Sequence, residues 1–99
     1  MKFGGLLREL RRQKNLGIKK AARELGVNYT YLSKLENDKA LPSEELIERI
    51  VNHFGGDRDL LYVAANKVPD DVMEAIRRNP KETLNYLRSL AEDGAERTR

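Results

Sequence analysis

The stretch Ile18–Asn37, IKKAARELGVNYTYLSKLEN, constrains the fold more than any other part of the chain. Apolar residues three apart in each half predict two short helices, because that spacing places them on one helix face. Gly26 ends the first helix, since glycine adopts the left-handed conformation of a helix C-terminus without steric cost. Asn28 is expected to cap the second helix, which begins at Tyr29. Ala22 has no bulk beyond Cβ and lets the helices cross closely, so the stretch predicts a helix-turn-helix.

A longer stretch, Leu16–Ser43, resembles the XRE (Cro/CI-type) repressor family. The shared features are the small residue, the Gly-Val turn, the YLSKLE helix and the Pro-Ser pair that opens the next helix. Residues 46–61 resemble the fourth and fifth helices of that family, and nothing beyond them does. The resemblance implies an all-α, five-helix, lambda-repressor-like domain that binds double-stranded DNA as a homodimeric transcriptional repressor. The two-fold symmetry of such a dimer predicts an inverted-repeat operator.

The helical pattern is interrupted after Asn66 by the sequence KVPD. Residues 1–66 are therefore expected to form the DNA-binding domain. Residues 67–92 are expected to form two further helices, one ending at Arg78 and one starting at Pro80. Facing apolar residues predict that these helices close into a hairpin, which contributes to dimerisation or extends the core. Residues 93–99, DGAERTR, are polar and are expected to be a flexible tail.

The net charge of +3 is unevenly distributed. Residues 1–42 hold ten Lys or Arg and four Asp or Glu, a net +6, whereas residues 43–99 hold nine and twelve, a net −3. Neutralising DNA phosphates releases condensed counterions, so a basic helix-turn-helix half indicates a polyanionic partner. Solvated helix faces are the alternative for the charge pattern alone. Together with the helix-turn-helix spacing, the pattern favours DNA.

The second helix of the motif is expected to face the major groove with the side opposite its buried leucines. The resemblance implies base readout at the positions of Tyr29, Thr30 and Lys34. Ser33 shares that side, and Asn28 lies at its leading edge. Lysine can donate to guanine, and threonine can bond a base or contact a thymine methyl group.

Phosphate contacts are expected on both sides of the motif. Lys19 and the backbone N–H groups of the first turn beginning at Ile18 can approach one phosphate. After the second helix, the loop containing Asn37 and Lys39 can hold another with its backbone amides and an ammonium group. Asp38 stands where the family prefers glycine, which weakens the expected contact.

Arg11 falls on the edge of the apolar stripe of the first helix. In the family, the matching arginine pairs with the glutamate that is Glu36 here. A charge on a core-facing edge is costly unless it is partnered, so we expect a partly buried ion pair. The alternative is two independently solvated side chains.

More apolar residues follow residue 57 than a single buried face requires. The resemblance implies that the fifth helix helps to form a dimer, and a surplus apolar face suits that role. The alternative is that the hairpin folds onto its own fifth helix and completes a monomeric core. The candidate dimer residues are Leu60, Leu61, Val63, Ile76, Leu84, Leu87 and Leu90.

Other classes of function find little support in the sequence. There is no cysteine and a single histidine, so disulfides, thiolate zinc sites and other metal sites are not expected. No phosphate loop or catalytic constellation is present, so we expect neither an enzyme nor a cofactor. No apolar run approaches a membrane span and no signal peptide opens the chain, which favours a cytoplasmic protein.

Two rivals remain to a repressor. One is an antitoxin that binds operator DNA and a toxin partner, and the other is a helix-turn-helix that serves as a protein-binding adapter. An adapter should lack strong salt-dependent DNA affinity, and an antitoxin should bind a second polypeptide through its acidic C-terminal part.

Overall fold

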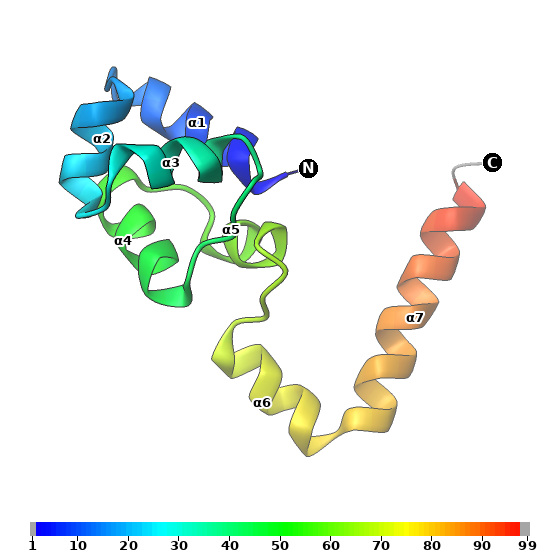
Figure 1. The fold of residues 1–99 in the computed structure, drawn as a ribbon. Helices are drawn as coiled ribbons and strands as arrows, with labels where there is room; N and C mark the ends of the chain where they lie inside the picture. Colours follow the sequence, from blue (N-terminus) through cyan, green and yellow to red (C-terminus); the bar gives the residue numbers. More distant parts are fainter. Residues whose placement is uncertain (1, 98–99) are drawn as a thin grey trace. The chain divides into compact units, whose positions relative to one another are not determined.

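A computed structural model of the chain describes residues 2–97, which form seven α-helices and no strand (Figure 1). They divide between Lys67 and Val68 into two compact units. The all-helical fold predicted from the sequence is confirmed. The helices are α1 (Phe3–Gln13), α2 (Ile18–Leu25), α3 (Tyr29–Glu36), α4 (Glu44–Phe54), α5 (Arg58–Ala64), α6 (Asp70–Arg78) and α7 (Pro80–Arg97).

Helices α2 and α3 form the predicted helix-turn-helix. Gly26 ends α2 with φ of 72°, a left-handed conformation that glycine adopts without strain. The N–H of the next residue, Val27, donates to the carbonyl of Ala22 at 2.9 Å and closes the last turn of α2. The side chain of Asn28 accepts from the N–H of Thr30 at 2.7 Å, which confirms it as the N-cap of α3.

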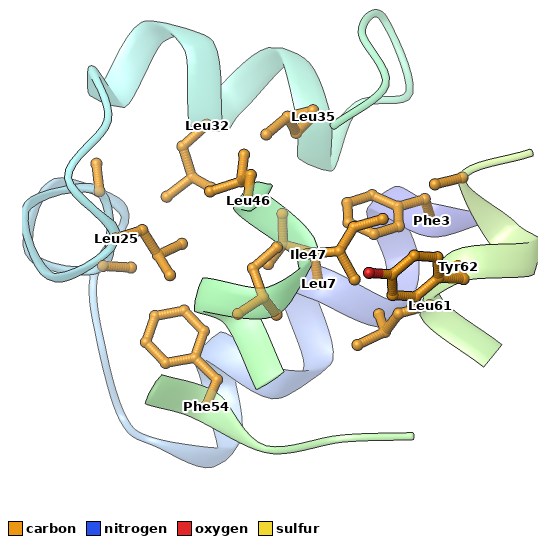
Figure 2. Packing of buried hydrophobic residues seen from close by; sticks show 14 residues of the cluster. Phe3, Leu7, Leu25, Leu32, Leu35, Leu46, Ile47, Phe54, Leu61 and Tyr62 are labelled. Atoms are coloured by element: carbon orange, nitrogen blue, oxygen red, sulfur yellow. The ribbon is translucent and has the colours of Figure 1, made fainter. Parts of the chain in front are cut away.

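One hydrophobic core fills the N-terminal unit. Figure 2 shows the leucines of α3, Leu32 and Leu35, pointing toward α4, while Phe3 and Leu7 enter from α1. α4 lies in the middle because it contacts α1, α2 and α5. Its first turn is capped by Ser43, whose hydroxyl accepts from the N–H of Leu46 at 3.1 Å. The core side chains are Phe3, Leu7, Ala21, Ala22, Leu25, Leu32, Leu35, Leu46, Ile47, Ile50, Phe54, Leu61, Tyr62 and Ala65.

Helix α5 is held to the core by Leu61 and Tyr62. Leu61 is only 2% exposed, so it belongs to the core and is removed from the candidate dimer surface. The ring of Tyr62 is buried too, and its hydroxyl donates to the carboxylate of Glu48 on α4. Arg58 donates to the same carboxylate at 2.8 Å. The apolar pattern of α5 did not predict a buried tyrosine, because the phenol needs a polar partner that only the tertiary structure supplies.

The C-terminal unit differs from the predicted closed hairpin. α6 and α7 have the expected bounds near Asn79, but they diverge from that residue as an open corner (Figure 1). No side chain of α6 is buried, and the leucines of α7 are exposed, so their apolar faces do not close on each other. α7 continues to Arg97, past the predicted start of a tail at residue 93. The last two residues of that tail lie outside the described part of the chain.

Candidate nucleic-acid interface

Helix α3 separates its buried residues from its polar ones. Leu32 and Leu35 are fully buried in the core. On the opposite side, Thr30 and Lys34 are exposed and Tyr29 is 49% exposed. Ser33 is half-buried at the edge of this polar side. The structure therefore brings together on one surface the side chains that the sequence assigned to base readout.

Asn28 has a structural role at the leading edge of α3. Its side-chain oxygen is occupied by the N–H of Thr30, which leaves the amide N–H groups to meet a base or a phosphate. The side chain is exposed. As the N-cap of α3, Asn28 also fixes the direction in which this helix leaves the turn.

A surface groove of about 300 Å³ lies between α2 and α3. The ammonium of Lys19 lies 5.2 Å from the ring centroid of Tyr29, within the range of a cation–π contact. Arg23 lines the same groove, although the sequence gave no reason to place it near α3. Two cations therefore flank the first residue of the helix that is expected to read bases.

The first three backbone amides after α3 are engaged within the protein. The N–H groups of Asn37, Asp38 and Lys39 donate to carbonyls at the end of α3, at 3.0, 3.2 and 2.8 Å. These three N–H groups close the last turn of the helix and are not available to a phosphate.

The side chain of Asn37 is also engaged within the protein. Its Nδ2 donates to the carbonyl of Ser33 at 2.8 Å, and its Oδ1 accepts from Arg8 at 3.3 Å. Asn37 thus caps α3 and links it to α1, which leaves little donor capacity for a phosphate. Lys39 is exposed, so its ammonium is free to meet a phosphate.

Asp38 adopts the left-handed conformation expected for its position, with φ of 58°. Its carboxylate is held within the protein and does not stand free as a charge that would repel a phosphate. It accepts from the backbone N–H of Gly4 at 2.9 Å, in the first turn of α1. Lys2, the N-cap residue of α1, accepts no hydrogen bond with its side chain. Asp38, from a loop distant in the sequence, therefore supplies the acceptor that caps the first turn of α1.

Glu36 anchors the C-terminal end of α3 to α1. Arg11 donates to both carboxylate oxygens, at 2.7 and 2.9 Å, with its side chain 15% exposed and that of Glu36 2% exposed. This is the pair that the resemblance implied. The hydrogen bonds to Glu36 raise the pKa of Arg11 above that of an ordinary guanidinium. Arg11 also donates to the carbonyl of Leu16 at 2.8 Å, so one side chain joins three segments.

Arg8 forms a second link that the sequence did not predict. It donates to the carboxylate of Glu36 at 3.4 Å and to the backbone carbonyl of Glu36 at 3.2 Å. The apolar spacing of α1 indicates which residues face the core and does not reveal a polar neighbour of Arg8. The signal available in the sequence was the i, i+3 spacing of Arg8 and Arg11, which puts both on the same side of α1.

Gly4 makes the close contact between α1 and α3 possible. A Cβ atom on Gly4 would lie 2.3 Å from the carbonyl oxygen of Glu36. Real side chains do not approach so closely, and only glycine fits without a shift of the helix. The local sequence does not reveal this requirement, because Glu36 is distant along the chain.

Comparison with known proteins decides the family of this unit. The profile of a family described as "Helix-turn-helix domain" matches residues 2–62. The chain belongs to this helix-turn-helix family. The ImmF control region 10 kDa protein of Bacillus phage phi105 is 33% identical over 70 residues, which cover 71% of this chain and 78% of that protein. No solved structure matches the chain significantly.

Family membership identifies α2 and α3 as the helix-turn-helix motif. In helix-turn-helix proteins the second helix of the motif lies in the major groove, and the first crosses the backbone. α3 and α2 are these helices, so the prediction of a DNA-binding helix-turn-helix regulator is confirmed at this level.

The candidate dimer residues other than Leu61 lie on three helices of this helix-turn-helix protein, α5, α6 and α7. On α5, Leu60 is partly exposed and Val63 is 64% exposed. On α7, Leu84, Leu87 and Leu90 are exposed, and Ile76 on α6 is half-buried.

Among the described residues, no cluster of His, Asp or Glu could hold a metal ion. No helix within residues 2–97 is both long and apolar enough to cross a membrane.

Proposed function

We propose that this protein is a sequence-specific transcriptional regulator of the XRE type, which represses by occupying an inverted-repeat operator as a homodimer. One observation carries the proposal most strongly: α3 exposes Tyr29, Thr30 and Lys34 while Glu36 and Asn28 hold its two ends. A helix fixed in this way presents its side chains to a major groove in a defined register.

The charge distribution supports DNA as the partner. The net +6 of residues 1–42 belongs to α1, α2, α3 and the loop that follows. Lys19, Arg23 and Lys39 lie in α2 or in the loop after α3, where they can approach phosphates beside the groove that α3 enters. The control-region name of the phage phi105 relative agrees with a regulatory role.

In vitro selection from random double-stranded DNA tests the proposal. We expect enrichment of one short sequence in two inverted copies, with centres about 10 to 10.5 base pairs apart or a multiple of that distance. Selection should be repeated with the double variant Thr30→Ala, Lys34→Ala, which keeps the fold but removes two base-facing side chains. The variant should return a shorter or less defined sequence.

DNA binding also separates a regulator from a protein-binding adapter. A protein-binding adapter would enrich no sequence and would show little dependence of DNA binding on salt. An enriched single site without an inverted copy would keep the DNA-binding function and remove the homodimer from the proposal.

A further inference from the structure

The C-terminal unit has no core of its own. Within residues 70–93 no side chain is buried. Folded units shorter than about 40 residues usually need a cross-link, a metal ion or a partner surface, and the chain has no cysteine. The large apolar side chains of α7 are therefore the feature that needs a partner.

Those side chains form one stripe along α7. Leu84, Leu87 and Ala91 follow one another at intervals of three and four residues, which puts them on the same helix face. Leu90 widens the stripe on one side. The three leucines are 38%, 46% and 49% exposed in sequence order, so a row of apolar surface runs along the helix.

A row of polar side chains borders this stripe. Lys81, Asn85, Arg88 and Glu92 are spaced by four, three and four residues and so lie along one edge. Arg88 donates to Asn85 at 3.2 Å, which agrees with that placement. The row begins with a positive charge and ends with a negative one.

We propose that a second copy of this chain covers the stripe, with the two α7 helices antiparallel. A two-fold axis near Leu87 places Leu84 beside the partner's Leu90, and Lys81 beside the partner's Glu92. The dimer then contains two Leu84–Leu90 contacts and two Lys81–Glu92 charge pairs. A parallel pair would put Lys81 level with the partner's Lys81 and far from the partner's Glu92.

This inference deepens the proposed function, because it names the surface that makes the regulator dimeric. It assigns that surface to α7 and not to α5. The DNA-binding unit keeps its own core and needs no partner to fold, so the two functions can be tested separately.

Two single substitutions in the full-length chain compare the candidate surfaces. Leu87→Glu puts a charge at the centre of the α7 stripe, and Val63→Glu puts one on the exposed face of α5. Both positions are exposed, so neither change disturbs the core. In sedimentation at micromolar concentration, we expect dimers for the unsubstituted chain and Val63→Glu, and monomers for Leu87→Glu. A dimeric Leu87→Glu protein, a monomeric Val63→Glu protein or a monomeric unsubstituted chain overturns the inference.

A charge exchange tests the antiparallel direction. Lys81→Glu and Glu92→Lys each create like charges across both symmetric pairs, and each should raise the dimer Kd on the order of 2- to 30-fold. The double variant restores opposite charges and should recover most of the affinity. No recovery, with both single variants weakened, would overturn the antiparallel arrangement.

Binding to DNA fragments with one or two half-sites distinguishes a failure of the proposed function from a failure of the α7 inference. Leu87→Glu should still bind a DNA fragment with one half-site, and should lose only the extra affinity for a fragment with two. If the unsubstituted chain binds neither fragment, the proposed function fails whatever the sedimentation result. If it binds one half-site but sediments as a monomer, the α7 inference and the homodimer both fail, while the DNA-binding function stands.

Discussion

The backbone N–H of Gly4 donates to the carboxylate of Asp38 at 2.9 Å, across 34 residues of sequence. The contact ties the first turn of α1 to the loop that follows α3. At the same point, the backbone of Gly4 lies against the carbonyl of Glu36. The position of the recognition helix α3 therefore depends on a glycine near the start of the chain.

The two neighbouring glycines of α1 should respond in opposite ways to substitution. Gly4→Ala should lower the free energy of unfolding by about 1–3 kcal/mol, because its Cβ would force α1 away from α3. Gly5→Ala is the matched control: nothing lies within 4 Å of its Cβ position, and alanine favours a helix interior by about 0.5–1 kcal/mol. Chemical denaturation measures both. Equal effects of the two changes would contradict the close contact at Gly4.

Arg11 and Glu36 should behave as a coupled pair. Glu36→Gln and Arg11→Met should each destabilise the fold by on the order of 3 kcal/mol, because each leaves a poorly solvated partner. The double variant should cost less than the sum of the two. Denaturation of the four proteins gives the coupling energy. Additive losses would show that the pair makes no specific contribution.

Thr30→Ala and Lys34→Ala should each relax base preference. If each side chain makes a good base contact, the loss on the preferred site is about 1–3 kcal/mol, and the loss on random DNA is smaller. Fluorescence titration with both DNAs at fixed salt checks this. Equal losses on both DNAs would reassign the two residues to phosphate contacts.

Lys39→Ala should weaken binding to all sequences. Removing one phosphate contact should reduce the slope of log affinity against log salt by about 0.9. Asn37→Ala is the control, because Asn37 carries no charge and its amide is engaged with Ser33 and Arg8. It should leave the slope unchanged. An unchanged slope for Lys39→Ala as well would remove that residue from the interface.

Glu48 should make stability depend on pH at the acidic end. The hydrogen bond from Tyr62, and then that from Arg58, lower the pKa of Glu48 below its ordinary value of 4.5. A depressed carboxyl pKa stabilises the fold above the unfolded pKa, and this contribution disappears as pH falls through the folded pKa. Glu48→Gln should therefore be less stable than the unsubstituted chain at pH 7. Denaturation at several pH values should show the difference shrinking below about pH 4.5; a constant difference would contradict the assignment.

Local signals predicted the helix-turn-helix well. Gly26, Asn28 and Ser43 act within a few residues of themselves, so the sequence alone located the turn and the two caps correctly. The bounds of α6 and the start of α7 followed in the same way from Asp70, Arg78 and Pro80.

Contacts between distant segments were harder to predict. Gly4, Arg8 and Asp38 act on partners some 30 residues away, which periodicity and local turn signals do not reveal. The prediction that α6 and α7 close into a hairpin differed from the structure for a related reason. Matching apolar faces show that α6 and α7 need a partner, but they do not say whether that partner is the neighbouring helix.

The opposite faces of α3 have a consequence for how relatives of this protein can diverge. Leu32, Leu35 and Glu36 hold the helix from one side, while Thr30 and Lys34 make no contribution to the core. Under the proposed function, substitutions at the exposed positions would change the DNA sequence that is recognised with little effect on folding. New DNA specificities would then arise by single replacements, without passing through unfolded intermediates.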